Sequence, residues 1–299
     1  MAGSICDILP SAAALLGAPD GVDTLGLTDQ TGAARRVVVL LVDGMGTELL
    51  PVMAPEAPTL AAVLAGQLGC LQRLECTFPS TTPTSLVSLG TGVLPGQHGV
   101  LGFTLNVPGT DRVLVHIFWS DDPPPTRWQP VPTWFTRLNR AGIGARAVLP
   151  EPFIGSGLTT AAYGGAIFRG TSPQADYATE LLDEIGAGPG LIFGYTNVLD
   201  TAAHLYGIGS PQWLTAAGQV EALLMRLVGE LPGETVLLVT ADHGGLNVPD
   251  DARIDLDADP ALRAGVRVVA GEPRVRYLHT EPGATADVLA AWAERLAGR

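Results

Sequence analysis

The sequence predicts an α/β fold in which a mostly parallel central sheet carries helices on both faces. Short runs of Val, Leu and Ile alternate along the chain with longer helical stretches. The apolar runs are about six residues or fewer, which suits buried strands and is far below the ~20 residues needed to cross a bilayer. With 299 residues, 46% of them hydrophobic, the chain can bury a large core, and we expect one domain over residues 1–299.

Each expected element is identified from its local pattern of apolar residues. The expected strands are residues 37–42, 71–77, 113–118, 145–149, 191–195, 236–240 and 266–269. The expected helices are residues 58–65, 82–89, 132–141, 173–185, 211–231 and 285–297, several of which have proline in the first turn, as a helix start permits. Residues 102–132 are irregular and rich in proline, and we expect them to form a small loop-rich cap. Residues 247–262 are acidic and are expected to face solvent.

The charge of the chain excludes some partners. The chain has 17 basic residues, all of them Arg, and 30 acidic residues, for a formal net charge of −13. Such a surface repels nucleic-acid backbones and anionic lipid head groups. We therefore expect no nucleic-acid polymer and no membrane as a partner.

The first residues and the cysteines bear on location. Residues 1–16 have no basic residue ahead of their apolar stretch and contain Asp7 and Pro10, unlike a secretory signal. Cys6, Cys70 and Cys76 form no CxxC spacing and leave an odd thiol, which argues against a disulfide framework. The expected location is the cytoplasm.

Polar residues follow three of the apolar runs. Asp43 ends the first predicted strand, Asp242 and His243 directly follow the run at 236–240, and Asp200 and His204 come shortly after the run at 191–195. Ligands of parallel sheets gather beyond the carboxyl ends of the strands. If the segment after residue 196 is helical, Asp200 and His204 share one face of that helix.

These residue types suit a divalent metal. Carboxylates combined with imidazoles are the ligands that Zn²⁺ accepts, and bound cations would supply the positive charge that an acidic chain needs to hold an anionic substrate. Taken alone, Asp43 could equally be a helix cap, and Asp200 with His204 could be an ordinary surface pair. Their joint occurrence in a chain with five histidines favours the metal site.

A hydroxyl cluster precedes the helix expected at 82–89. It consists of Ser80, Thr81, Thr82, Thr84 and Ser85. A hydroxyl at this point lies near a helix N-terminus, which favours anionic oxygens. The alternative is that the cluster only caps the helix.

The motifs together resemble the type I phosphodiesterase and nucleotide-pyrophosphatase family of the alkaline-phosphatase superfamily. A strand ends in Asp43, and Thr82 lies nine residues before Thr91, with which the motif Thr-Gly-x-x-Pro-x-x-His-Gly begins. Asp-x3-His, Asp-His-Gly and a late histidine follow, so that the resemblance covers residues 43–279. It implies an alkaline-phosphatase-like fold and a hydrolase of small-molecule phosphoesters that uses Thr82 as nucleophile and forms a phosphothreonine.

The resemblance also implies two divalent metal ions, most simply Zn²⁺, and assigns their ligands. One ion would be held by Asp43, Thr82, Asp242 and His243, and the other by Asp200, His204 and His279. For the last of these the alternative is an ordinary strand histidine, since it follows the strand-like run VRYLH. The remaining histidines, His98 and His116, are expected to be structural.

The substrate is the least defined part of the resemblance. The family places an asparagine five residues after the histidine of the His-Gly turn, where this chain has Phe103, with Asn106 nearby. We expect these two residues at the substrate. Residues 77–111 contain no Arg, which favours a monoanionic diester over a dianionic monoester. Phe103, Phe118 and Trp119 could hold the second ester group or could be core.

Four alternatives remain open at this point. A phosphomonoesterase or a phosphonate hydrolase could use the same scaffold. A cofactor-independent phosphoglycerate mutase would need a large inserted domain that the chain lacks. A metal-binding pseudoenzyme would keep the ligands without turnover.

Overall fold

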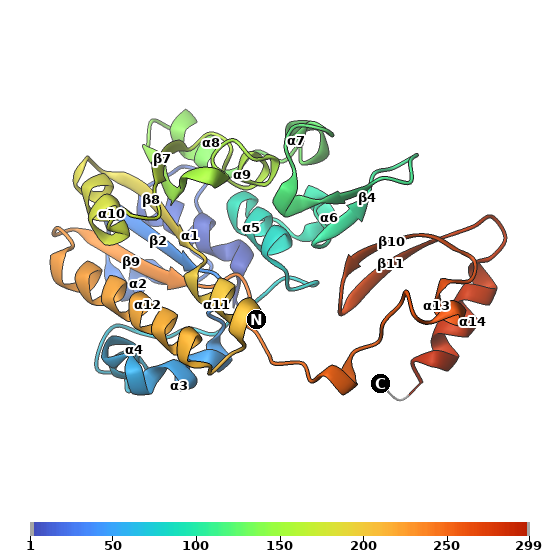
Figure 1. Cartoon of the computed structure of the whole chain (residues 1–299). Helices are drawn as coiled ribbons and strands as arrows, with labels where there is room; N and C mark the ends of the chain where they lie inside the picture. Colours follow the sequence, from blue (N-terminus) through green and yellow to red (C-terminus); the bar gives the residue numbers. More distant parts are fainter. Residues whose placement is uncertain (1–2, 298–299) are drawn as a thin grey trace.

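The centre of the molecule is a parallel five-stranded sheet (Figure 1). The computed structural model describes residues 3–297. The strand order is β7-β6-β8-β2-β9, and every neighbouring pair is parallel. The strands are β2 (Arg36–Val42), β6 (Ala145–Pro150), β7 (Ile167–Thr171), β8 (Gly190–Thr196) and β9 (Thr235–Thr240). The prediction of a mostly parallel α/β sheet is confirmed.

Helices cover both faces of this sheet, because the interior strand β2, between β8 and β9, is apolar on both sides. Val37, Val39 and Leu41 belong to one buried core, whereas Val38 and Leu40 belong to the other. The first core is covered by α1 (Ile8–Leu15), α5 (Thr82–Thr91), α8 (Trp134–Arg140) and α9 (Gly157–Tyr163). The second is covered by α3 (Leu50–Met53), α4 (Pro58–Leu64), α10 (Tyr177–Gly186), α11 (Val198–Tyr206) and α12 (Pro211–Glu230).

A second sheet joins two distant parts of the chain. It is antiparallel, in the order β11-β10-β4-β5. Its strands are β4 (Thr104–Asn106), β5 (Val113–Val115), β10 (Val266–Glu272) and β11 (Val275–Thr280). The segment expected as a cap therefore supplies half of this sheet, and the C-terminal part, drawn in red in Figure 1, supplies the rest.

The remaining elements are short or lie outside these sheets. They are β1 (Gly3–Ser4), which pairs with β3 (Leu74–Glu75), and α2 (Leu27–Thr31), α6 (Pro95–His98), α7 (Pro125–Trp128), α13 (Pro260–Arg263) and α14 (Thr285–Arg295). The 3-10 helices are η1 (Ile5–Asp7), η2 (Thr47–Leu49), η3 (Ala54–Glu56), η4 (His116–Phe118), η5 (Glu151–Phe153) and η6 (Asp250–Ala252).

Three strand predictions need correction. The run at 71–77 contributes only β3, outside the central sheet, because Gln72, Arg73 and Glu75 cannot be buried between two helical layers. The run at 113–118 is a strand for three residues and then turns into η4. The run at 266–269 forms a longer strand than expected, and it belongs to the antiparallel sheet.

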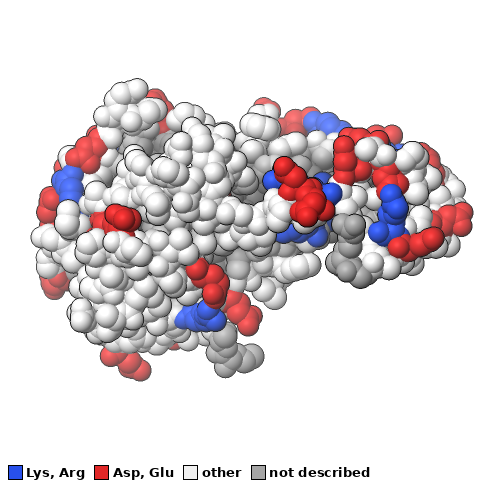
Figure 2. Space-filling model, turned by 60° about the horizontal axis from the view of Figure 1, so that its bottom comes forward, with Lys and Arg blue, Asp and Glu red and all other residues white. Residues whose placement is uncertain are grey.

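The surface carries its charges in small groups. Figure 2 shows arginines beside carboxylates on the face it presents, so that this face has no extended basic patch among the residues drawn in colour or white.

Across residues 3–297, no helix combines the length and the apolar character that crossing a membrane requires.

Candidate active site

Two glycines allow three loops to meet beyond the end of β2. Gly44 has φ +75°, and a Cβ on it would lie 3.1 Å from the Cβ of Asp200. A Cβ on Gly46 would lie 2.5 Å from the Cα of Gly244, which is closer than atoms approach. Both positions therefore need glycine, and the turn after Asp43 brings the start of α11 and the loop after β9 close to this carboxylate.

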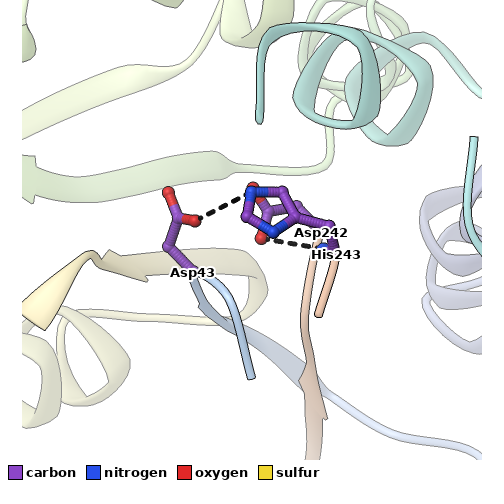
Figure 3. A group of neighbouring side chains, drawn as sticks. All are labelled: Asp43, Asp242 and His243. Atoms are coloured by element: carbon purple, nitrogen blue, oxygen red, sulfur yellow. Dashed lines mark hydrogen bonds and ion pairs between the residues drawn. The ribbon is translucent and has the colours of Figure 1, made fainter. Parts of the chain in front are cut away.

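Asp43, Asp242 and His243 form one compact group (Figure 3). Each offers a ligand atom, and these atoms all lie within 4.8 Å of one another. His243 Nε2 is 3.4 Å from Asp43 Oδ1 and 3.6 Å from Asp242 Oδ2. The group forms because β2 and β9 are parallel neighbours, with Leu41 opposite Thr240, so that the residues after both strands emerge at one edge.

Only half of the carboxylate oxygens in this group are hydrogen-bonded. Asp43 Oδ2 accepts a hydrogen bond from the Tyr195 hydroxyl at 2.5 Å. Asp242 Oδ1 accepts from the backbone N–H groups of Gly44 at 3.1 Å and His243 at 3.0 Å. The other oxygens, Asp43 Oδ1 and Asp242 Oδ2, are buried without a hydrogen bond from any described residue. Such oxygens are costly unless a cation or a donor satisfies them.

The electrostatics of the group also fit a cation. Burial, followed by the charges of Asp242 and Asp200, raises the pKa of Asp43 well above its ordinary value. Burial likewise raises the pKa of Asp242, although His243 and backbone donors partly oppose this. Negative charge confined in this way is stabilised by a divalent ion. The residues present therefore fit a bound metal.

His243 presents a nitrogen lone pair to the group. Its Nδ1 lies 2.8 Å from the carbonyl oxygen of Gly244, which can only accept, so this hydrogen bond assigns the proton to Nδ1 in the neutral ring. Nε2 then faces the two orphaned oxygens as an acceptor. A backbone carbonyl on the far nitrogen is the usual way in which proteins orient a metal-binding histidine.

Thr82, the first residue of α5, completes the group. Its Oγ1 lies 3.0 Å from His243 Nε2. Thr81 is the N-cap residue and is 5% exposed, and its hydroxyl lies 3.1 Å from the hydroxyl of Thr84. The backbone thus directs adjacent threonines to different surroundings, and of the two hydroxyls only that of Thr82 contacts His243.

Asp200 and His204 lie beside the group on α11. Asp200 is close enough to raise the pKa of Asp43, and its Oδ2 is 3.5 Å from His204 Nε2. The His204 side chain is 77% exposed. Their spacing of four residues therefore puts them on one helix face, as the sequence predicts, with the imidazole open to solvent.

The structure does not bring His279 to these residues. It lies on β11 opposite Val268, in the antiparallel sheet. Among residues 3–297, the ligand atoms that lie close enough together to hold a metal ion are those of Asp43, Asp242 and His243, and His279 is not among them. Residues 275–280 form a strand of their own, β11, and this strand pairs with β10. His279 is therefore a strand residue, which was the alternative that the sequence left open.

Phe103 and Asn106 have structural contacts. The carbonyl oxygen of Phe103 lies 3.1 Å from Nδ1 of the buried His116. Asn106 Nδ2 donates to the carbonyl oxygens of Thr110 at 2.8 Å and Arg112 at 3.1 Å, which closes the turn between β4 and β5. Neither residue lines the cavity described next.

A small apolar cavity of about 70 Å³ adjoins Thr82. Its lining is uncharged and consists of Thr82, Leu86, Ile117, Leu149, Phe153, Ser156, Leu158, Thr159, Tyr163 and Tyr195. The Tyr163 hydroxyl is buried without a hydrogen bond from the described residues. Phe118 and Trp119, which the sequence suggested as contacts for the second ester group, do not line this cavity. Trp119 is in the core and 2% exposed, and Phe118 is 80% exposed.

Sequence reasoning missed the aromatic lining of this cavity. Phe153, Tyr163 and Tyr195 come from η5, α9 and β8, and no spacing connects them. One signal was present for Tyr195, which is the last residue of the apolar run at 191–195 and lies five residues before Asp200.

Comparison with solved structures shows the fold. Murine ectonucleotide pyrophosphatase/phosphodiesterase 5, solved in an inactive form with AMP, matches with a TM-score of 0.67 and 17% identity over 88% of this chain and 71% of its own. The human protein of the same name matches with a TM-score of 0.63 and 17% identity, over 86% and 69%. Phosphonoacetate hydrolase from Sinorhizobium meliloti, solved with phosphonoacetate, matches with a TM-score of 0.55 and 22% identity, over 74% and 60%.

Comparison of the sequence shows the family. A search of curated proteins finds no match. The family model of type I phosphodiesterase / nucleotide pyrophosphatase matches residues 37–299, which is most of the chain. The family is metal-dependent, and the group of Asp43, Asp242 and His243 is a possible metal-binding cluster. The chain belongs to the type I phosphodiesterase / nucleotide pyrophosphatase family and is a hydrolase of that type.

Proposed function

We propose that the chain is a metal-dependent hydrolase of small phosphodiesters or nucleotide pyrophosphates that acts through a phosphothreonine on Thr82. One observation carries the proposal. The Thr82 hydroxyl lies 3.0 Å from His243 Nε2, beside two buried carboxylate oxygens that have no hydrogen bond within the described residues. A nucleophile next to an incomplete ligand set is the arrangement that metal-assisted phosphoryl transfer requires.

Two divalent ions would occupy this region. Asp43, Asp242, His243 and Thr82 would hold one, and Asp200 with His204 would contribute to the other. Mixed carboxylate and imidazole ligands favour Zn²⁺. When bound, the ions would lower the pKa of the threonine hydroxyl and neutralise charge on the phosphoryl group.

The reaction has two steps, and Thr82 takes part in both. Thr82 Oγ attacks phosphorus, its proton ends on the leaving ester oxygen, and the bond from phosphorus to that oxygen breaks. Water then attacks the phosphothreonine, a new bond from phosphorus to the water oxygen forms, the bond to Oγ breaks, and a proton of the water ends on Oγ, which restores the threonine. The position of Thr82 at the start of the ten-residue helix α5 stabilises negative charge that develops at this point.

The cavity beside Thr82 supports a diester as substrate. Its lining contains no charged residue, and residues 77–111 contain no Arg. A dianionic monoester would need additional positive charge, for which an Arg fork is the usual source. The second ester group of a diester needs apolar or aromatic contact, which Phe153 and Tyr195 offer. The same lining disfavours a carboxylate-bearing phosphonate.

A turnover panel tests the proposal. Apoprotein is prepared with a chelator, reconstituted with Zn²⁺, Mn²⁺ or Mg²⁺, and assayed at one pH with p-nitrophenyl phosphate, methyl p-nitrophenyl phosphate, the p-nitrophenyl ester of thymidine 5′-phosphate and phosphonoacetate. The expected result is metal-dependent turnover with the highest kcat/KM for a diester. A clear preference for the monoester would promote a phosphatase, preference for phosphonoacetate a phosphonate hydrolase, and no turnover with any metal a pseudoenzyme.

A further inference from the structure

A guanidinium from the antiparallel sheet contacts the loop that leads into α5. Arg274, in the turn between β10 and β11, donates from Nη2 to the carbonyl oxygen of Ser80 at 3.2 Å. The two residues are 194 positions apart, and Ser80 precedes Thr82 by two. We propose that Arg274 is a positioning residue for Thr82. The inference rests on the proposed role of Thr82 as nucleophile.

Arg274 stabilises the loop by a hydrogen bond from a distant part of the chain. The carbonyl oxygen of Pro79 accepts hydrogen bonds from the Thr77 hydroxyl at 2.9 Å and from the N–H of Thr81 at 3.1 Å. Both donors belong to the loop itself. The carbonyl oxygen of Ser80, in contrast, has Arg274 as its partner among the described residues. Without Arg274 the Ser80 carbonyl oxygen would lose this partner, and the loop would keep one long-range hydrogen bond, from Cys76 Sγ to the carbonyl oxygen of Asp242 at 2.6 Å.

A buried carboxylate orients the guanidinium. Arg274 Nε donates to Glu272 Oε2 at 3.1 Å, and the Glu272 side chain is only 6% exposed. The donors of a guanidinium lie in one rigid plane, so that Nε and Nη2 can bind two different partners at once. A lysine ammonium at the same position offers a single nitrogen and could not reproduce both contacts.

The turn that carries Arg274 is itself held in place. Gly271 on β10 pairs with Thr104 on β4, and the Thr104 hydroxyl donates to the Gly271 carbonyl oxygen at 2.9 Å. The Tyr277 hydroxyl on β11 donates to the carbonyl oxygen of Leu101 at 2.6 Å. Figure 1 shows the turn between β10 and β11 at the end of this sheet that faces α5. The C-terminal hairpin is therefore fixed to the chain that follows α6 and delivers Arg274 to the loop.

Arg274 acts through the backbone in this arrangement. Its Nε and Nη2 donate to Glu272 and Ser80, and no hydrogen bond between described residues joins it to Thr82, so its effect on Thr82 passes through the loop. Displacement of a nucleophile by about 1 Å can cost about 100-fold in rate. Loss of the contact should therefore lower kcat and leave KM and metal affinity nearly unchanged.

The test compares three variants. Arg274→Lys keeps a cation for Glu272 and loses the double contact. The double variant Arg274→Gln/Glu272→Gln removes both charges, so that no unpaired carboxylate stays buried. Arg276→Lys is the matched control, because Arg276 is exposed on the same hairpin and has no ion pair among residues 3–297. Amide hydrogen exchange of the segment 76–86 is measured without substrate, and kcat, KM and Zn²⁺ affinity are measured separately.

Both Arg274 variants should exchange at least about tenfold faster at 76–86 and lose about 10- to 100-fold in kcat for a diester, with KM and Zn²⁺ affinity within about twofold. Arg276→Lys should match the wild type in every measurement. Unchanged exchange together with unchanged kcat in Arg274→Lys, or in the double variant, would overturn the inference. If the wild type hydrolyses no phosphoester, only the proposed function fails, and the exchange rates still decide whether Arg274 holds the loop.

Discussion

The hydroxyl of Thr82 lies 3.0 Å from Nε2 of His243, although 161 residues separate them. One residue begins a helix on a face of the sheet, and the other follows the edge strand β9. Their contact, next to the orphaned oxygens of Asp43 and Asp242, concentrates a nucleophile, an imidazole and two carboxylates at one edge of the sheet. The predictions below follow from this arrangement and its surroundings.

Replacement of Thr82 by Ala should reduce turnover to background, at least about 10³-fold, because the attacking oxygen is lost. Zn²⁺ content should stay near that of the wild type, since Asp43, Asp242 and His243 remain. Steady-state kinetics and metal analysis check this. Thr81→Ala is the control and should change kcat/KM by less than about threefold, because the Thr81 hydroxyl contacts Thr84. Equal losses in the two variants would show that the nucleophile has been misassigned.

Replacement of Asp43 by Asn should have opposite effects with and without metal. Without metal, Asn removes one of two repelling buried charges and can still accept from Tyr195, so the free energy of unfolding should rise by about 1 kcal/mol. With Zn²⁺ at 100 times the Kd, the wild type should gain about 2.7 kcal/mol and the variant much less. Urea unfolding in chelator and in Zn²⁺ measures both. Equal stabilisation by Zn²⁺ would remove Asp43 from the ligand set.

Two buried histidines should make the protein acid-sensitive. Burial, and then the charge of His116, lowers the pKa of His98 to about 4, and burial lowers the pKa of His116 to about 4. Because the unfolded chain binds these protons more tightly, the stability is complete above pH ~6.5 and is lost as the pH falls towards 4, by about 3 kcal/mol for each histidine.

The variant His98→Asn isolates one of these contributions. Asn can keep an acceptor for the Val100 N–H, which donates to His98 Nδ1 at 3.1 Å, and it does not titrate. Denaturant unfolding between pH 7 and 4 in the presence of chelator should show a loss about 3 kcal/mol smaller in the variant than in the wild type. Parallel curves for the two proteins would contradict the prediction.

The cavity beside Thr82 should limit the size of the second ester group. Ile117 lines the cavity and is 44% exposed, so Ile117→Ala should enlarge it at little cost in stability. We expect the ratio of kcat/KM for a phenyl diester to that for a methyl diester to rise about threefold to tenfold. Ile167→Ala is the control, because Ile167 is 64% exposed on β7 and does not line the cavity. An unchanged ratio in Ile117→Ala would place the ester group elsewhere.

The sequence by itself determined four of the five strands of the central sheet, β2, β6, β8 and β9, and the positions of polar residues at their ends, but it did not indicate the edge strand β7. The apolar run at 37–42 could only be a strand buried on both faces, and residue 43 had to emerge at its carboxyl end. The same reasoning placed Asp242 and His243 after the run at 236–240. Local patterns carry this information, because the periodicity of burial and the end of a strand are properties of a few neighbouring residues.

Only the tertiary structure decided which strands are neighbours and what surrounds the site. The position of β2 between β8 and β9 brings Asp200 and Asp242 to Asp43, and the antiparallel sheet brings Arg274 to Ser80 while it keeps His279 on β11. These relationships join segments more than 150 residues apart. They depend on long-range strand pairing and side-chain packing, for which no short stretch of sequence contains a signal.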